Sequence, residues 1–376
     1  MPVFQPIREF LDSQEVSSLL AENKRCLVSL PETATVAEGL QTLAKEGILS
    51  VPILDQDGEY EGALSVGDCL KNFTTMLEGN HPRWIDFADD IREESIRACA
   101  KLFLAKPVQK LQHPGELWLM TAGFKSSVLD ACVESFNIQE LHVHHRLYLC
   151  APAQAEAHTE TKGTEVTVVS VAPGSEKPGA TGLKVSHVLS QTDVVRLIHK
   201  NADKFSEILS KTVDEVELTD HAVFTTSVTT SALKAFGFMA KDKKSSIGLV
   251  DEDGKLVGNL SSSDIRFCSN EDDFPLLLHP AGLFSLAVHG VSGAASKADL
   301  LEGKGPSPSD LTGKWGDVMS AWPLVSVKEE STLKEVLDAL VKHSIHRVYV
   351  LDGEGKPVSI ITLTDLLRLF TKPPPQ

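Results

Sequence analysis

The sequence is poor in cysteine, and its cysteines form no pattern that would hold a metal ion. Six cysteines stand singly along the 376 residues, mostly inside apolar segments, and no CxxC occurs. Closely spaced cysteines mark zinc and redox sites, and a high cysteine content marks small secreted proteins. We therefore interpret the six as reduced core thiols of an intracellular protein.

Positive charge and long apolar runs are also lacking. The chain has 36 Lys and Arg residues against 52 Asp and Glu, a net charge of −16. This balance argues against nucleic acid and membrane surfaces as partners, since both bind positively charged surfaces. No run of about 18 apolar residues occurs, so no transmembrane helix is expected, and no secretory signal is visible at the N-terminus. An anionic ligand would have to be held by individual Arg and His residues.

Catalytic signatures are missing as well. We find no Walker A loop, no GxGxxG in a βαβ setting, no GxSxG and no HExxH. The length and the 42% hydrophobic content suit two ordinary domains with ample core. The sequence thus predicts regulation rather than catalysis, with no catalytic cofactor and no metal.

What the chain does have is a motif repeated four times. An apolar residue is followed by Ser or Thr, any residue, then Ser, Thr or Gly, and an Asp. In copies one, three and four an acidic residue stands 13 positions before that Asp, with glycine three residues later, which predicts a turn between two strands. The four motifs are Ser65-Val66-Gly67-Asp68, Ser190-Gln191-Thr192-Asp193, Ser261-Ser262-Ser263-Asp264 and Thr362-Leu363-Thr364-Asp365.

A helical pattern precedes each predicted hairpin and begins with hydroxyl residues, which are favoured helix N-caps. The repeating unit is therefore helix, strand, strand, helix, and one unit is too small to bury its apolar face, so copies should pair. The four helix starts are at Thr35, Ser126-Ser127, Thr230-Ser231 and Ser331-Thr332.

Two insertions interrupt the repeats. Residues 151–182 separate the two strands of copy two, and we expect them to form a long mobile loop. Residues 268–315 lie between copies three and four, with an apolar, helical part at 276–291. Residues 84–104, between copies one and two, are expected to form one helix.

On these motifs the chain resembles the cystathionine-β-synthase (CBS) domain family, and in particular the gamma subunits of AMP-activated and sucrose-non-fermenting-related protein kinases of plant or algal type. The resemblance implies an α/β (α+β) fold, with four CBS motifs in two CBS-pair modules that form a pseudo-symmetric disc. Module 1 would span 1–205, with motifs at about 20–75 and 105–200. Module 2 would span 206–376, with motifs at about 210–268 and 315–372.

The resemblance also implies the site residues. In this family the Asp that begins the last helix holds the ribose hydroxyls, while Ser, Thr and a strand His-Arg contact phosphate. His-Arg occurs in the even copies and Ser in the odd copies, as expected for paired modules. The ribose ligands would be Asp68, Asp193, Asp264 and Asp365. The phosphate and hydroxyl contacts would be Thr35, Ser50, Ser65, His145, Arg146, Ser190, Thr192, Thr230, Ser246, Ser261, Ser263, Thr332, His346, Arg347, Thr362 and Thr364.

The predicted function is a non-catalytic energy sensor that binds AMP, ADP or ATP and assembles with alpha- and beta-type kinase subunits in the cytoplasm, and also in the nucleus. Two alternatives remain open: an interaction scaffold whose Asp residues are only helix N-caps, and a regulator that senses another adenosyl ligand such as S-adenosylmethionine. Weaker interpretations are a metal site at His142, His144 and His145 and a phosphate contact at Lys241, Lys243 and Lys244.

Overall fold

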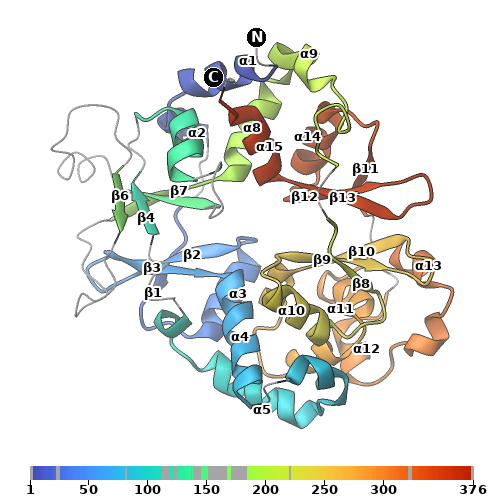
Figure 1. Cartoon of the computed structure of the whole chain (residues 1–376). Coiled ribbons are helices and arrows are strands. Elements are labelled where there is room, and N and C mark those ends of the chain that lie inside the picture. Colours follow the sequence, from blue (N-terminus) through green and yellow to red (C-terminus); the bar gives the residue numbers. More distant parts are fainter. Residues whose placement is uncertain are drawn as a thin grey trace.

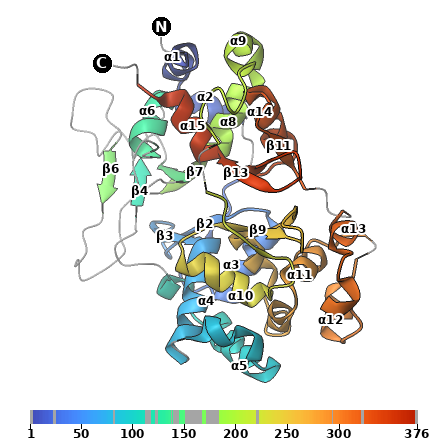
Figure 2. The same ribbon diagram turned by 45° about the vertical axis from the view of Figure 1, so that its right-hand side comes forward.

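The chain forms a flattened disc with strands across its middle and helices on its two outer sides (Figures 1 and 2). The two termini lie near each other at the upper edge in Figure 1. The computed structural model describes residues 3–22, 26–80, 83–111, 118–121, 125–136, 138, 145–150, 167–170, 184–219, 222–292, 294–320 and 324–373.

Each copy contains the predicted order helix, strand, strand, helix, preceded by a short strand that was not predicted. Copy one is β1 (Leu30–Pro31), α3 (Val36–Lys45), β2 (Ser50–Leu54), β3 (Tyr60–Ser65) and α4 (Val66–Asn80). Copy two is β4 (Trp118–Thr121), α6 (Val128–Asp130) with the π-helical turn η3 (Ala131–Ser135), β5 (Arg146–Cys150), β7 (Val185–Ser190) and α8 (Gln191–Lys200). Copy three is β8 (Thr225–Ser227), α10 (Ala232–Lys241), β9 (Ser246–Val250), β10 (Leu256–Ser261) and the 3₁₀ helix η5 (Ser262–Phe267). Copy four is β11 (Ser326–Lys328), α14 (Leu333–Lys342), β12 (Arg347–Leu351), β13 (Pro357–Thr362) and α15 (Leu363–Thr371).

The predicted acidic turns are confirmed. In copy one, Asp55 Oδ1 accepts the backbone N–H groups of Asp57 at 2.9 Å and Glu59 at 2.7 Å. Gly58 follows with φ of 76°, a left-handed conformation that glycine adopts without strain. Copies three and four repeat this turn around Asp251 and Asp352.

Two predictions outside the repeats need correction. Residues 84–104 form two helices, η1 (Trp84–Asp90) and α5 (Glu93–Leu104), because the backbone is extended at Ile91 and Arg92. The loop predicted at 151–182 contains strand β6 (Thr167–Ser170), which pairs antiparallel with β4. The rest of that loop, like His142 and His144, lies outside the described residues.

The second insertion is largely helical, as its apolar part predicted. It contains η6 (Phe274–Leu278), α11 (Ala281–Val288), α12 (Lys297–Leu301) and η7 (Pro308–Leu311), and α13 (Trp315–Met319) begins at its last residue. All eight residues of α11 are buried, so its apolar residues on every side satisfy core contacts.

The segment before each copy crosses to the other copy of its pair. Val36 N–H donates to the Lys106 carbonyl, and Val108 N–H donates to the Ala34 carbonyl, both at 2.9 Å. These bonds fasten the segment before copy two onto copy one. The same two-bond bridge recurs at the start of every copy; the bridged residues are Thr35 with Pro107, Glu15 with Ser127, Ser231 with Pro280 and Thr212 with Thr332. The crossing segments include α1 (Gln5–Ser13), α2 (Val16–Glu22), η2 (Val108–Leu111), η4 (Ala202–Phe205) and α9 (Ser206–Leu209).

Two large apolar cores hold the disc together. The lower half in Figure 1 combines copies one and three, where α4 packs on α10 and η5. The upper half combines copies two and four, where α8 packs on α14 and α15. Among the residues that the structure describes, a small apolar cluster around Tyr60, Tyr148 and Val185 lies between the halves. The crossing segments pair copy one with copy two and copy three with copy four, which is the pairing expected of two modules. The module boundary near residue 205 stays our prediction.

In the part of the chain that the structure describes, no helix is both long and apolar enough to span a membrane.

Candidate functional site

The repeated Asp residues share one local geometry. In each copy Oδ2 of the Asp accepts the backbone N–H of the Ser or Thr three residues earlier, at 2.8–2.9 Å. This is a capping box, in which the Ser or Thr is the N-cap and the Asp is the third helical residue. The alternative that the Asp residues are themselves the N-caps is therefore wrong. The N-caps are Ser65, Ser190, Ser261 and Thr362.

Strand register brings most predicted site residues to one end of each hairpin. Ser50 is paired with Ser65 in copy one, and Ser246 with Ser261 in copy three. In the even copies the paired residues are Arg146 with Ser190 and Arg347 with Thr362. The start of the first hairpin strand thus lies beside the start of the last helix of the same copy, where the Asp carboxylate is. A third hydroxyl in this region, Thr364, donates to Gln191 Oε1 at 3.0 Å and so joins copies two and four. The hydroxyls of Thr192 and Ser263 occupy the matching helix positions, and Gly67 stands there in copy one.

Three predicted residues are not brought to that end. Thr35, Thr230 and Thr332 lie where the helix before the hairpin begins. Strand β1 ends beside the far end of β2, with Pro31 paired to Leu54, and β11 ends the same way beside β12. The Thr35 and Thr332 side chains form capping boxes with Glu38 and Glu335. Within its own copy, each of the three threonines is therefore a strand's length from the Asp carboxylate, and a ligand role for them stays a prediction.

Tyrosines that the repeat analysis missed connect the two halves of the disc. Tyr148 Oη lies 3.0 Å from Ser50 Oγ, which joins copy two to copy one. Tyr349 Oη donates to Asn259 Oδ1 at 2.6 Å, which joins copy four to copy three. Each Tyr follows the Arg of the His-Arg pair by two residues, and so shares that strand face. That spacing was a usable signal.

Positive side chains from three copies converge around His346. Burial, together with the charges of Arg146, Arg347, His145 and Arg266, lowers the pKa of His346 to about 4. We call these five residues the central cationic cluster. Four of its members stand at the predicted His-Arg positions, namely His145, Arg146, His346 and Arg347; Arg266 was not predicted.

The arginines of this cluster keep unused hydrogen-bonding capacity. Arg347 Nη2 donates to Ser245 Oγ at 3.1 Å, and Arg266 Nη1 donates to the Ile48 carbonyl at 3.3 Å. Arg347 Nη1 and Arg266 Nε are buried without a hydrogen-bond partner among the described residues. Burial lowers the pKa of Arg146 and Arg347, and the nearby Asp193 and Asp264 oppose this. Half-buried guanidinium groups with unsatisfied N–H donors are suited to bind an anion such as phosphate.

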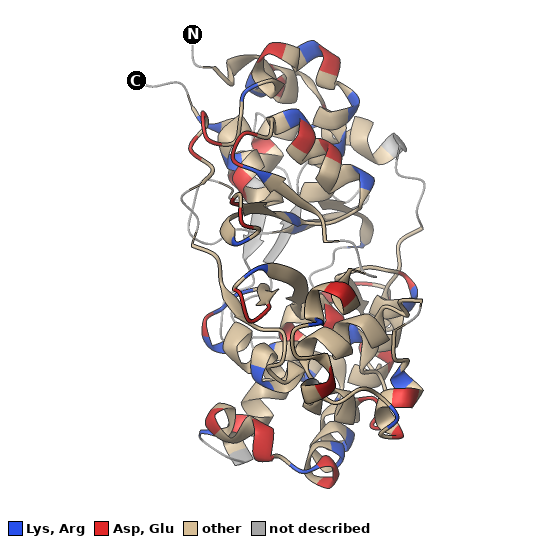
Figure 3. Cartoon of the chain, turned by 90° about the vertical axis from the view of Figure 1, so that its right-hand side faces the viewer, with Lys and Arg blue, Asp and Glu red and all other residues tan. Residues whose placement is uncertain are grey.

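Charged residues of both signs alternate over the outer helices (Figure 3), in contrast to this inner concentration of positive charge. Lys241, Lys243 and Lys244 are exposed, as expected for a solvated helix end. Within the described ranges, no group of three His, Cys, Asp or Glu side chains is arranged to bind a metal.

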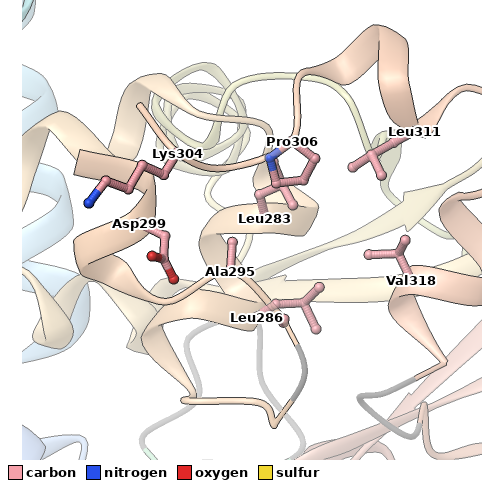
Figure 4. A pocket seen from close by; sticks show the side chains of 9 residues that line it. Leu283, Leu286, Ala295, Asp299, Lys304, Pro306, Leu311 and Val318 are labelled. Atoms are coloured by element: carbon pink, nitrogen blue, oxygen red, sulfur yellow. The ribbon is translucent and has the colours of Figure 1, made fainter. Parts of the chain in front are cut away.

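A separate cavity of about 330 Å³ lies among the helices of the second insertion. Asp299 and Lys304 stand on one side of it, and Leu311 and Val318 on the other (Figure 4). None of its lining residues is a predicted site residue, so it does not belong to the candidate site. The remaining lining residues are Leu283, Leu286, Ala294, Ala295 and Pro306.

Comparison with known proteins agrees with the repeat analysis. The CBS domain model matches residues 20–74, 213–270 and 315–372, which are copies one, three and four. Copy two has the same elements and the same capping box but lies outside these matches. A stretch of 131 residues is 32% identical to an uncharacterized protein of Methanocaldococcus jannaschii and covers 74% of it.

Both a plant relative and a solved archaeal structure align with nearly the whole chain. "SNF1-related protein kinase regulatory subunit gamma-like PV42a" of Arabidopsis thaliana is 21% identical over 374 residues, which cover 93% of this chain and 92% of that protein. The crystal structure of a Methanocaldococcus jannaschii protein, proposed as an archaeal homolog of g-AMPK, superposes with a TM-score of 0.56 at 14% identity. That alignment covers 92% of this chain and 97% of the archaeal one, and it supports the fold alone.

Proposed function

Because the chain belongs to the CBS-domain family, we propose that it is a non-catalytic regulatory protein that binds an adenine nucleotide (AMP, ADP or ATP) between its copies. The observation that carries the proposal is the juxtaposition of two groups at the middle of the disc. Carboxylates stand at the starts of the last helices, and arginines of the central cationic cluster lie beside them. A nucleotide has the complementary groups, a diol at one end and phosphate at the other.

The chemistry of each end suits these residues. The Asp carboxylate has about four acceptor positions and the capping box uses only some of them, so the same carboxylate has the chemistry to accept ribose hydroxyl groups as well. The helix N-terminus favours negative charge. Arg146 and Arg347 supply planar, permanently charged donors for phosphate oxygens. Asp365, Asp193 and Asp68 are half-buried and therefore open to a ligand.

The proposed partners are the catalytic and scaffold subunits of a kinase complex. Similarity to the gamma-like plant protein over nearly the full length of both chains supports this assignment. It is tested by co-expression with alpha- and beta-type subunits, followed by size-exclusion chromatography with and without nucleotide. Failure to co-elute with such subunits in either condition would contradict the kinase assignment and would leave nucleotide binding untouched.

Nucleotide binding is tested by isothermal titration of the purified chain with AMP, ATP and, in parallel, S-adenosylmethionine. We expect Asp365→Asn to weaken nucleotide binding about tenfold or more, since a hydrogen bond to a charged group contributes about 1.5–3 kcal/mol. The matched control is Glu335→Gln, which removes the charge from the other capping box of copy four, at the far end of the hairpin. Glu335→Gln should leave affinity unchanged.

Each alternative function has its own outcome in this experiment. Tight binding of S-adenosylmethionine that excludes AMP and ATP would replace the nucleotide by another adenosyl ligand. No binding of any of the three, with Asp365→Asn and Glu335→Gln equally destabilised, would make the Asp residues purely structural. The chain would then be an interaction scaffold.

A further inference from the structure

Copy three differs from the other copies because a side chain from the second insertion reaches its Asp. His289 follows directly after α11, and its Nε2 lies 3.2 Å from Oδ1 of Asp264. The imidazole ring also packs edge-on against Phe267, with 5.2 Å between ring centroids. These two contacts fix the ring over the carboxylate, the group that accepts ribose hydroxyls in our proposal.

The carboxylate of Asp264 is also the most enclosed of the four. Asp264 is only 4% exposed, whereas Asp68, Asp193 and Asp365 are half-buried. Its Oδ2 accepts the Ser261 N–H at 2.9 Å, and its Oδ1 faces both His289 and the Ser263 hydroxyl, which is 3.4 Å away. Asp264 therefore has neither the access nor the acceptor capacity that two ribose hydroxyls require.

The position of His289 is firmly determined. The segment that carries it is fastened to copy three by two backbone hydrogen bonds, from Ala281 N–H to the Thr230 carbonyl at 2.7 Å and from Ala232 N–H to the His279 carbonyl at 2.9 Å. Helix α11 is buried along its whole length in the core of the lower half. Moving His289 away from Asp264 by shifting the helix would expose that apolar surface to water.

We propose that His289 closes the third site. It holds Asp264 as an internal partner, so that copy three offers no ribose carboxylate, and nucleotides bind through the Asp residues of other copies. Asp264 instead contributes negative charge beside Arg266 and Arg347 of the central cationic cluster. This inference rests on the proposed nucleotide binding and adds to it which of the four repeated carboxylates is excluded.

The test is the number of ATP molecules bound per chain, measured by equilibrium dialysis with labelled ATP. In the wild-type background, Asp264→Asn should leave this number unchanged, while Asp365→Asn should lower it or weaken binding about tenfold. His289→Ala should add one site, and Asp264→Asn in the His289→Ala background should remove that site again. Lys304→Ala, an exposed residue of the same insertion, is the control and should change nothing. Thermal unfolding of each variant confirms that it is folded.

The outcomes separate this inference from the function on which it rests. If the wild type binds ATP and Asp264→Asn removes a site, Asp264 is a working ribose ligand and the closed third site is wrong. The same conclusion follows if His289→Ala is folded and binds no additional ATP. If neither the wild type nor any folded variant binds ATP, AMP or ADP, the proposed function itself is overturned, and this inference with it.

Discussion

His346 gives the sharpest test of the central cationic cluster. Burial, together with the charges of Arg146 and Arg347, lowers the pKa of His346 from 6.5 to about 4. As the pH falls, the unfolded chain takes up this proton first, so the folded state loses stability between about pH 6.5 and pH 4 and keeps it fully above that range. At about 1.36 kcal/mol per pH unit, the difference between the two pKa values corresponds to about 3 kcal/mol.

The assay is histidine-selective NMR across pH 3.5–8, with His346→Gln to assign the resonance. We expect the wild-type His346 resonance to titrate near pH 4. Thermal unfolding should agree: His346→Gln should lose less thermal stability than the wild type between pH 7 and pH 5. Added ATP should move the titration upward, because phosphate would offset the surrounding arginines. A His346 pKa near 6.5 in the nucleotide-free chain would refute the arrangement of charges described above.

Further substitutions test the repeat architecture. Thr362→Ala removes the N-cap hydroxyl of α15 and should lower the free energy of unfolding by about 1 kcal/mol; no change in denaturant midpoint would contradict this. Gly237→Ala places a Cβ 2.6 Å from the Trp84 ring and should destabilise the chain by about 1–3 kcal/mol. Gly79→Ala, in an exposed helix position with nothing within 4 Å, should instead stabilise it by up to about 1 kcal/mol. Equal effects of the two glycine substitutions on the melting temperature would contradict the packing described here.

The repeating unit could be predicted because its signals are local. An Asp that accepts two backbone N–H groups, followed by a glycine with positive φ, specifies the hairpin turn within five residues. The leading strands β1, β8 and β11 were missed because two or three residues give no periodicity, and their pairing is decided by the neighbouring hairpin. The crossing of segments between paired copies is likewise decided by tertiary packing, and no local sequence pattern indicates it.

For the candidate site, comparison of the copies in register was the productive signal. It identified Arg146 and Arg347 by alternation, and it could have identified Arg266. Two residues after the repeated Asp the other copies have Leu70, Val195 and Leu367, so an arginine at this apolar position is the exception. His289 could not be found this way, because it belongs to an insertion with no counterpart in the other copies.

The segments that are exchanged between paired copies limit how such a chain can gain or lose copies. In each copy, the helix before the hairpin begins where two backbone hydrogen bonds join it to the segment that precedes the other copy of the pair. A single copy cannot be lost, gained or transplanted without leaving one helix start in its neighbour unbridged and one segment without a partner. The unit that can be duplicated or deleted intact is therefore a pair of copies, and one duplication of such a pair gives a four-copy chain.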